Sequence, residues 1–159
     1  MIVVSDTSPI CYLVLIGEID LLPRLFSQVH VPQAVMSELR HQDAPSDLRR
    51  WAARVPSWML VRETQAGSME GLERLQRGEQ AAIQLAQSIN ADLILLDEKS
   101  GRRVASERGL HVTGTLGVLG EAAARGLLDW LTTIDRLTKT NFRYSPSLLK
   151  ALLDRSGRL

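Results

Sequence analysis

Apolar and polar residues follow one another along the chain in blocks that favour short buried strands and longer helices. Short apolar runs predict strands over residues 2–4, 29–31, 57–63, 91–97 and 110–114, the third of them at a sheet edge. Helical periodicity predicts helices over residues 9–16, 19–26, 32–40, 44–55, 78–89, 100–109 and 115–128. Because strands and helices alternate, we expect an α/β fold with a mainly parallel sheet covered by helices on both faces.

Local signals set the predicted ends of several elements. Ser8 suits the cap and Pro9 the first position of the first helix, which we expect to end at Gly17. Pro32 closes the second strand and suits the first turn of the next helix. The stretch TQAGSMEG, residues 64–71, is predicted to be a loop, and residues 129–159 predict two more helices broken at Ser145 and Pro146.

Length and composition indicate one globular domain. The chain has 159 residues, 45% of them hydrophobic, so we expect a single core over residues 1–127 with a helical extension over 128–159. The single cysteine excludes an internal disulfide, and the three scattered histidines lack the spacing of a zinc site. No apolar run approaches a membrane span and no basic segment precedes the first one, which predicts a cytoplasmic protein without membrane contact. The net charge of +1 excludes a strongly basic scaffold.

Four acids stand where a parallel sheet would bring them together. Asp6 directly follows the apolar run IVVS, and Asp97 directly follows LILL. Glu79 lies at the predicted start of the helix that leads into LILL, and Glu38 lies on the helix after the second strand. Since the carboxyl ends of parallel strands share one edge of the sheet, we expect both aspartates there, with both glutamates in reach.

A cluster of carboxylates repels itself and raises the pKa values of its members unless a divalent cation is bound. Ligands that are all oxygen favour Mg²⁺ or Mn²⁺, ions that activate water and stabilise the leaving oxygen in phosphodiester hydrolysis. Each acid also has an ordinary interpretation. Asp6 fits a turn or cap, Glu38 and Glu79 fit exposed helix positions, and Asp97 with Glu98 fits the amino end of the next helix.

Four stretches in a fixed order resemble a known family. They are SDTSPI, VPQAVMSELR, RGEQAAIQLA and ADLILLDEKSGRRVASERGLHVTGTLGVL, and they extend from residue 2 to about residue 119. The tail FRYSPSLLKALL fits the same group. The sequence thus resembles the PIN domains, in particular the predicted nucleic-acid-binding subgroup related to VapC-type toxins.

The resemblance implies a three-layer α/β/α sandwich and a ribonuclease site that uses Mg²⁺ or Mn²⁺. Carried onto this chain, the catalytic and metal-binding set is Asp6, Glu38, Glu79 and Asp97. Asp6 and Asp97 are the expected central ligands, while both glutamates complete the site or position the attacking water. Hydroxyl groups of Thr7, Ser8 and Thr115 are expected to support it.

Two departures from the family pattern concern the ligand set. Many PIN nucleases carry aspartate at the position of Glu79. Many also place a second aspartate two residues after the acid of the fourth strand, where this chain has Lys99, with Glu98 as the neighbouring substitute. A rival hypothesis follows, in which the fold binds RNA or a partner protein without cleaving.

The expected partners are RNA, a second copy of the chain and an antitoxin protein. Arg102 and Arg103, at a predicted helix amino end, suit an RNA phosphate, with a solvated helix face as the equal alternative. By resemblance the protein forms a homodimer and is the toxin of a toxin–antitoxin pair. Phe142 and Tyr144 are candidates for contact with an antitoxin segment.

Competing enzyme classes fit the same residues less well. The run GTLGVLG does not have the spacing of a dinucleotide fingerprint. A phosphatase of the haloacid dehalogenase type needs a second aspartate at the position of Ser8, and a receiver domain needs an acidic pair where only Asp6 is present. These motifs therefore favour neither class.

Overall fold

Strands and helices alternate along the chain as the apolar pattern predicts. The structure is a computed structural model that describes residues 1–64 and 67–156; positions 65 and 66 of the expected loop, and 157–159 of the expected extension, lie outside the description. In chain order the elements are β1 (Val3–Ser5), α1 (Thr7–Leu15), α2 (Leu21–Phe26), β2 (Val29–Pro32), α3 (Gln33–Leu39), α4 (Ser46–Ala52), β3 (Met59–Arg62), α5 (Arg77–Ser88), β4 (Leu93–Leu95), α6 (Lys99–Glu107), β5 (Val112–Thr113), α7 (Thr115–Ala124), α8 (Trp130–Thr138) and α9 (Pro146–Ser156).

The five strands form one parallel sheet in the order β3-β2-β1-β4-β5. The strand with the sequence MLVR lies at one edge, as predicted. The chain builds the sheet outward from β1 on one side, and then crosses over to add β4 and β5 on the other side. This change of direction places β1 directly beside β4, with Ser5 opposite Leu95.

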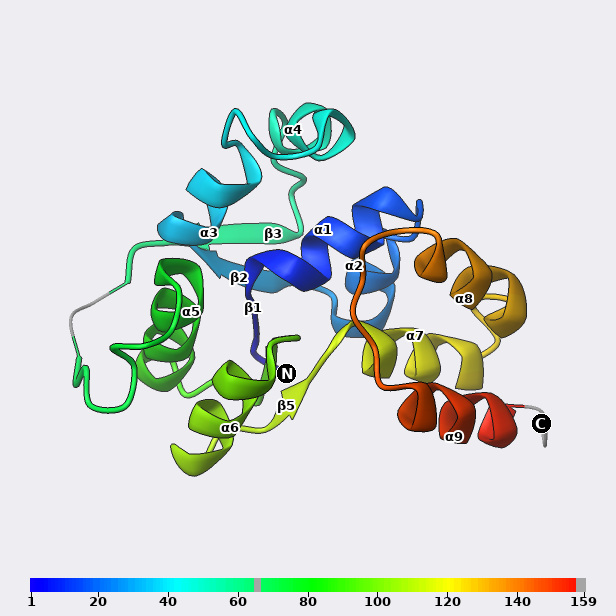
Figure 1. Cartoon of the computed structure of the whole chain (residues 1–159). Coiled ribbons are helices and arrows are strands. Elements are labelled where there is room, and N and C mark those ends of the chain that lie inside the picture. Colours follow the sequence, from blue (N-terminus) through cyan, green and yellow to red (C-terminus); the bar gives the residue numbers. More distant parts are fainter. Residues whose placement is uncertain (65–66, 157–159) are drawn as a thin grey trace.

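Successive strand residues point to opposite faces, and each face has its own hydrophobic core. Val3 and Leu95 pack against α1–α4, α7 and α8, whereas Val4 and Ile94 pack against α5 and α6. Figure 1 shows α5 and α6 on one side of the sheet and α1, α2 and α7 on the other. The α/β/α sandwich expected from the sequence is confirmed.

Helix α1 begins two residues earlier than predicted. Asp6, not Ser8, is the residue before the helix, with an extended backbone at φ −79° and ψ 177°. Pro9 lies in the first turn, where the missing N–H has no helical partner to lose. The predicted end is right, since Gly17 follows the helix with a φ of +75°. Asp6 therefore joins the strand directly to the helix.

The other boundaries differ by a few residues. Pro32 ends β2 with an extended backbone and precedes α3, so its predicted place within the helix is wrong. Helices α8 and α9 correspond to the two predicted in the tail, and Trp130 and Ile134 of α8 join the core beside α1. The division into a core and an extension stays a prediction. Within residues 1–64 and 67–156, no helix is both long and apolar enough to span a membrane.

Candidate functional site

Asp6 and Asp97 lie at the point where the direction of strand addition reverses. Asp6 follows β1, and its backbone N–H donates to the carbonyl oxygen of Leu95 at 2.9 Å. Asp97 comes two residues after that leucine. Ligands of open parallel sheets bind outside the carboxyl ends of the strands at this kind of switch point. The two aspartates are therefore delivered to the part of the fold best suited to hold a ligand.

Glu38 reaches the same region from α3. Its Oε1 accepts a hydrogen bond at 3.0 Å from the backbone N–H of Gly78, near the start of α5. Its Oε2 accepts a hydrogen bond from the hydroxyl of Thr7, the residue after Asp6. An unpaired N–H at a helix start is a good donor to a carboxylate, so α1 and α5 together fix Glu38 beside the cluster.

Glu79 lies in the first turn of α5, with 5% of its surface exposed. The backbone N–H of Gln76 donates to its Oε1 at 3.3 Å, which is half of a capping box. A Cβ atom added to Gly101 of α6 would lie 2.4 Å from Oε2 of Glu79. Helix α6 thus approaches Glu79 closely because it carries glycine at this position.

Asp97 is held by a single residue at the start of α7. The backbone N–H of Thr115 donates to Oδ1 and its hydroxyl donates to Oδ2, each at 2.7 Å. Gly114 makes the approach possible, because a Cβ atom there would lie 2.6 Å from Oδ1. The guanidinium of Arg102 lies next to this glycine. The carboxylate is therefore oriented by α7 and faces a cation from α6.

Burial, together with repulsion from neighbouring acids, disfavours the charged forms of Asp6, Glu79 and Asp97. Burial raises the pKa of Asp6 from 3.8 to about 7, and the charges of Glu79, Glu38 and Asp97 add to the effect. Burial is also the main cause of the raised pKa of Glu79, with Glu98 and Glu38 contributing. The pKa of Asp97 is raised by burial although both Thr115 hydrogen bonds and Arg102 oppose the change. The four acids thus share one electrostatic environment.

Two carboxylate oxygens in this environment are buried without a partner. Among the described residues, Oδ1 of Asp6 and Oε2 of Glu79 accept no hydrogen bond. Such oxygens are costly unless a proton or a cation satisfies them. Within the same part of the chain, no three histidine, cysteine or acidic side chains come close enough together to enclose a metal ion by themselves.

Of the other residues expected at the site, some lie beside the acids and one does not. Ser8 and Glu98 line a groove beside Glu79 and Asp97, and Glu98 is exposed at the residue before α6. Arg102 lines it too, on the fourth residue of α6. Arg103 is absent from that lining, is mostly exposed, and lies 3.9 Å from Glu107 of the same helix. Of the two arginines expected to bind phosphate, Arg102 therefore lies at the site and Arg103 lies on a solvated face of α6.

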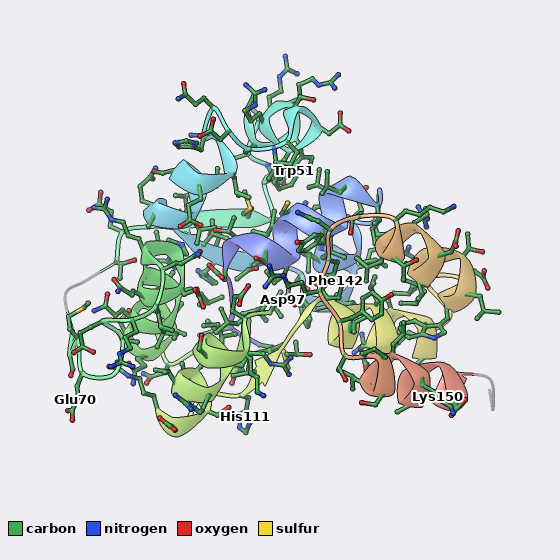
Figure 2. The ribbon with its side chains drawn as sticks, viewed as in Figure 1. Trp51, Glu70, Asp97, His111, Phe142 and Lys150 are labelled. Atoms are coloured by element: carbon green, nitrogen blue, oxygen red, sulfur yellow. The ribbon has the colours of Figure 1, made fainter. Side chains whose placement is uncertain are left out.

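A groove of about 1000 Å³ opens beside Glu79 and Asp97. Figure 2 shows Asp97 and Phe142 near the middle of the molecule, where both line this groove. Our reading of the sequence missed several lining residues, among them Tyr12, Arg74, Asn141 and Arg143. Tyr12 lies inside a predicted helix and gave no signal, whereas Arg74, Asn141 and Arg143 were polar or basic residues near predicted helix ends. The glycines that face Glu38, Glu79 and Asp97 were a second signal, because each lies within a predicted helix or directly before one.

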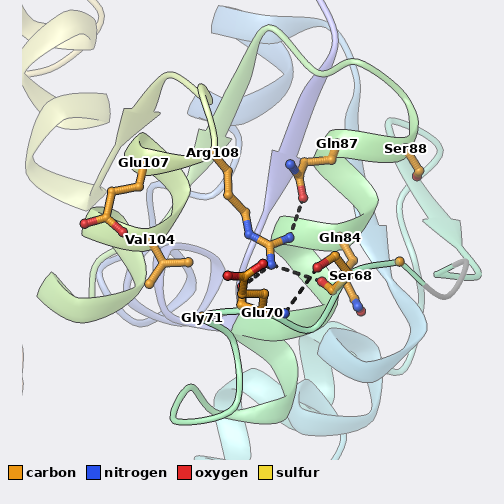
Figure 3. A pocket seen from close by; sticks show the side chains of 10 residues that line it. Ser68, Glu70, Gly71, Gln84, Gln87, Ser88, Val104, Glu107 and Arg108 are labelled. Carbon is orange, nitrogen blue, oxygen red and sulfur yellow. Dashed lines mark hydrogen bonds between the residues drawn. The ribbon is translucent and has the colours of Figure 1, made fainter.

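A second hollow, of about 780 Å³, lies away from the acids between α5, α6 and the segment 67–71. Arg108 reaches into it, as Figure 3 shows, and donates to Oε1 of Gln87 at 2.7 Å and to the carbonyl oxygens of Ser68 and Glu70. The guanidinium is occupied by these bonds and holds the segment before α5 in place. The contacts of Arg108 around this hollow thus support α5, the helix that carries Glu79.

The comparisons with known proteins agree with the fold. The solved structure of a PilT N-terminus domain protein from the hyperthermophilic archaeon Sulfolobus solfataricus P2 is similar to this one, with a TM-score of 0.51 and 14% sequence identity. The match covers 91% of this chain and 100% of that chain. No curated protein sequence matches. A family model for PIN domains, DUF3368, matches residues 2–158. The chain therefore belongs to the PIN-domain family.

Proposed function

We propose that this protein is a metal-dependent ribonuclease that hydrolyses RNA phosphodiester bonds. PIN domains are commonly nucleases and generally use divalent metal ions. One observation carries the proposal for this chain, namely the partnerless buried oxygens of Asp6 and Glu79 within a group of four acids. An acid group that is costly to bury is expected where a cation or a proton binds during function.

The donor chemistry fits Mg²⁺ or Mn²⁺. Every candidate ligand is a carboxylate oxygen, as hard divalent cations prefer. Mg²⁺ is usually held by one or two carboxylates and keeps several waters, so a site without three converging protein ligands is suited to it. Asp6 and Asp97 would be the central ligands, with Glu79 beside them. When bound, the ion supplies a stronger nucleophile from water and stabilises charge on the phosphate oxygens.

The protein's own residues orient the reacting groups. Thr115 holds both oxygens of Asp97 and thereby sets the direction of that carboxylate. Thr7 and Gly78 hold Glu38 at the rim of the cluster, in a position to accept a proton from an attacking water. Arg102, next to Asp97, is placed to bind a phosphate of the substrate.

A metal titration tests the proposal. Purified protein is incubated with labelled single-stranded RNA while Mn²⁺ or Mg²⁺ is increased from zero. Cleavage is expected in the wild type and lost in Asp6→Asn and Asp97→Asn. Asp92→Asn is the matched control, because Asp92 lies beside β4 at its opposite end, where it accepts a hydrogen bond from the N–H of Ile2. Equal cleavage by all four proteins, each with an unchanged circular dichroism spectrum, would contradict the proposal.

A second function, binding without cleavage, is favoured by a different observation. Both oxygens of Asp97 already accept hydrogen bonds from Thr115, and no three acids among the described residues converge on one point. A PIN fold of this kind would hold RNA or a partner protein and leave it intact. RNA binding that persists at saturating Mn²⁺ without any cleavage would establish this function in place of the first.

The toxin role, the homodimer and the antitoxin are proposed with the nuclease function. Phe142, one of two residues expected at the antitoxin contact, is 9% exposed and packs edge-on against Tyr12, so Tyr144 is the more accessible of the two. A toxin is expected to arrest growth on induction, and Asp6→Asn is expected to relieve the arrest. Light scattering after size-exclusion chromatography determines whether the chain forms a dimer.

A further inference from the structure

The segment that joins α8 to α9 forms one wall of the groove beside the acids. Residues 141–145 and Leu148 line the groove opposite residues of α5 and α6. In Figure 1 this connection runs from α8 to α9 past the end of β5. Only three of the described residues that line the groove are acids, Glu79, Asp97 and Glu98, so the others can contact a bound substrate at some distance from the reacting bond.

Tyr12 of α1 holds this wall in place. Its hydroxyl donates to Oδ1 of Asn141 at 3.1 Å, and its ring meets the ring of Phe142 edge-on at 5.0 Å between centroids. Because Phe142 is buried, it anchors the segment to the core. The two residues after it, Arg143 and Tyr144, are exposed and both line the groove. The wall is therefore fixed at its base and presents a cation and an aromatic ring.

The charge of the groove suits a polyanion. Four cationic side chains line it beside the three acids Glu79, Asp97 and Glu98: Arg74, Lys99, Arg102 and Arg143. They surround acids that would otherwise repel phosphate groups. The pKa of the Tyr12 hydroxyl is raised mainly by burial and further by Cys11, Asp97 and Glu98, and Arg143 opposes this change in part. Positive charge is thus supplied to the groove by the wall, by α6 and by the segment before α5.

We propose that the 141–145 segment reads a single-stranded RNA substrate, with a base stacked on Tyr144 and a phosphate bound by Arg143. Tyr144 is 40% exposed and lines the groove, so its ring is accessible to a flat partner. A base stacks on an aromatic side chain only when it is unpaired, and duplex RNA keeps its bases inside the helix. The inference rests on the proposed nucleic-acid function of the same site and adds the residues outside the acid group that contact the RNA.

Binding and cleavage are measured separately to test the inference. Fluorescence anisotropy in EDTA, where metal-dependent cleavage is absent, gives Kd for a labelled single-stranded RNA, for its duplex and for single-stranded DNA of the same sequence. Tyr144→Ala is expected to weaken single-strand binding about tenfold, and Tyr144→Phe to leave it close to the wild type, because stacking needs the ring and not the hydroxyl. Duplex RNA is expected to bind more weakly than the single strand.

The contribution of Arg143 is measured separately, through the salt dependence of RNA binding. Loss of one phosphate contact lowers the slope of log K against log salt by about 0.7 for a single strand, so Arg143→Ala is expected to show that smaller slope. Arg54→Ala is the matched control, since this exposed arginine at the end of α4 does not line the groove. Circular dichroism checks that each variant is folded, and Tyr12→Phe tests the anchor without altering either contact residue.

The outcomes separate this inference from the nuclease proposal. If the wild type cleaves RNA and Tyr144→Ala binds and cleaves equally well, the inference is wrong and the nuclease function stands. If no metal supports cleavage but single-strand binding depends on Tyr144, the nuclease proposal fails and the inference that the 141–145 segment binds RNA stands. Equal affinity for duplex and single strand, or no RNA binding by the wild type, as expected when a protein occupies the groove, overturns the inference.

Discussion

Replacing Asp6 by asparagine is expected to stabilise the protein at neutral and alkaline pH. Asp6 is 4% exposed, and its surroundings raise its pKa from 3.8 to about 7. A change of one pKa unit corresponds to 1.36 kcal/mol, so the charged carboxylate costs about 4 kcal/mol in the folded protein. Asparagine has nearly the same shape and carries no charge. Its amide group can donate to the neighbouring carboxylates, so the substitution removes the cost without leaving a cavity.

The effect depends on pH in a defined way. Below pH 3.8 the Asp6 carboxyl is protonated in both the folded and the unfolded chain, and it adds no pH dependence. Between pH 3.8 and about 7 the unfolded chain releases this proton while the folded chain keeps it, so the free energy of unfolding falls as pH rises. Above that range the loss is complete. The Asp6→Asn variant lacks this titration and therefore loses less stability across the window, while the titrations of Glu79 and Asp97 remain in both proteins.

Urea denaturation in EDTA between pH 4 and pH 8.5 measures the difference. The variant and the wild type are expected to match near pH 4 and to diverge to at most about 4 kcal/mol by pH 8. Asp92→Asn, the control at the other end of β4, is expected to run parallel to the wild type. Mn²⁺ at a hundred times its Kd is expected to restore about 2.7 kcal/mol to the wild type at pH 8 and less to the variant.

Two results would refute this reasoning. One is a constant difference between Asp6→Asn and the wild type at every pH, which would mean that Asp6 titrates normally in the folded protein. The other is a variant that is less stable than the wild type at pH 8. In that case the charged carboxylate would be a favourable part of the ligand-free fold.

Substitutions at three further positions test the residues that support the site. Gly101→Ala adds a Cβ atom 2.4 Å from Oε2 of Glu79, and we expect displacement of this carboxylate to slow RNA cleavage about a hundredfold in a turnover assay. Thr115→Val removes the hydroxyl that donates to Oδ2 of Asp97 and is expected to cost about 1–3 kcal/mol at pH 8 by urea denaturation, with Thr115→Ser restoring most of it. Ile83→Ala, on the fully buried face of α5, is expected to cost about 2–5 kcal/mol and Ile83→Val about 0.5–1.5 kcal/mol by the same method.

Local sequence pattern was enough to place the two aspartates. Asp6 and Asp97 each follow an apolar run, and the alternation of strands and helices made the sheet parallel, so both had to leave at one edge. The position of β1 directly beside β4 was not predictable in this way. It results from the order in which strands add to the sheet, and apolar periodicity carries no information about that order.

The contacts that complete the site depend on the folded arrangement. Thr7 and Glu38 are 31 residues apart, and Tyr12 and Asn141 are 129 residues apart, so no local motif connects them. The start of α1 was misplaced for a related reason. Ser8 and Pro9 form a good local helix signal, but the strand before them delivers Asp6 directly into the helix, and tertiary structure outweighs the local preference.

The same burial that makes the acids unfavourable is what would make a cation bind. Packing of two separate cores against β1 and β4 keeps Asp6 out of water, and glycines at the closest approaches let α6 and α7 press against Glu79 and Asp97. A proton or a cation bound to these carboxylates relieves the repulsion, and a cation that binds only the folded protein stabilises it by an amount that grows with its concentration relative to its Kd. We therefore expect Asp6→Asn to gain stability in the absence of the cation and to lose affinity for it, because removal of the same carboxylate causes both effects. A variant that gained stability while keeping full Mn²⁺ affinity would show that the ion binds elsewhere on the protein.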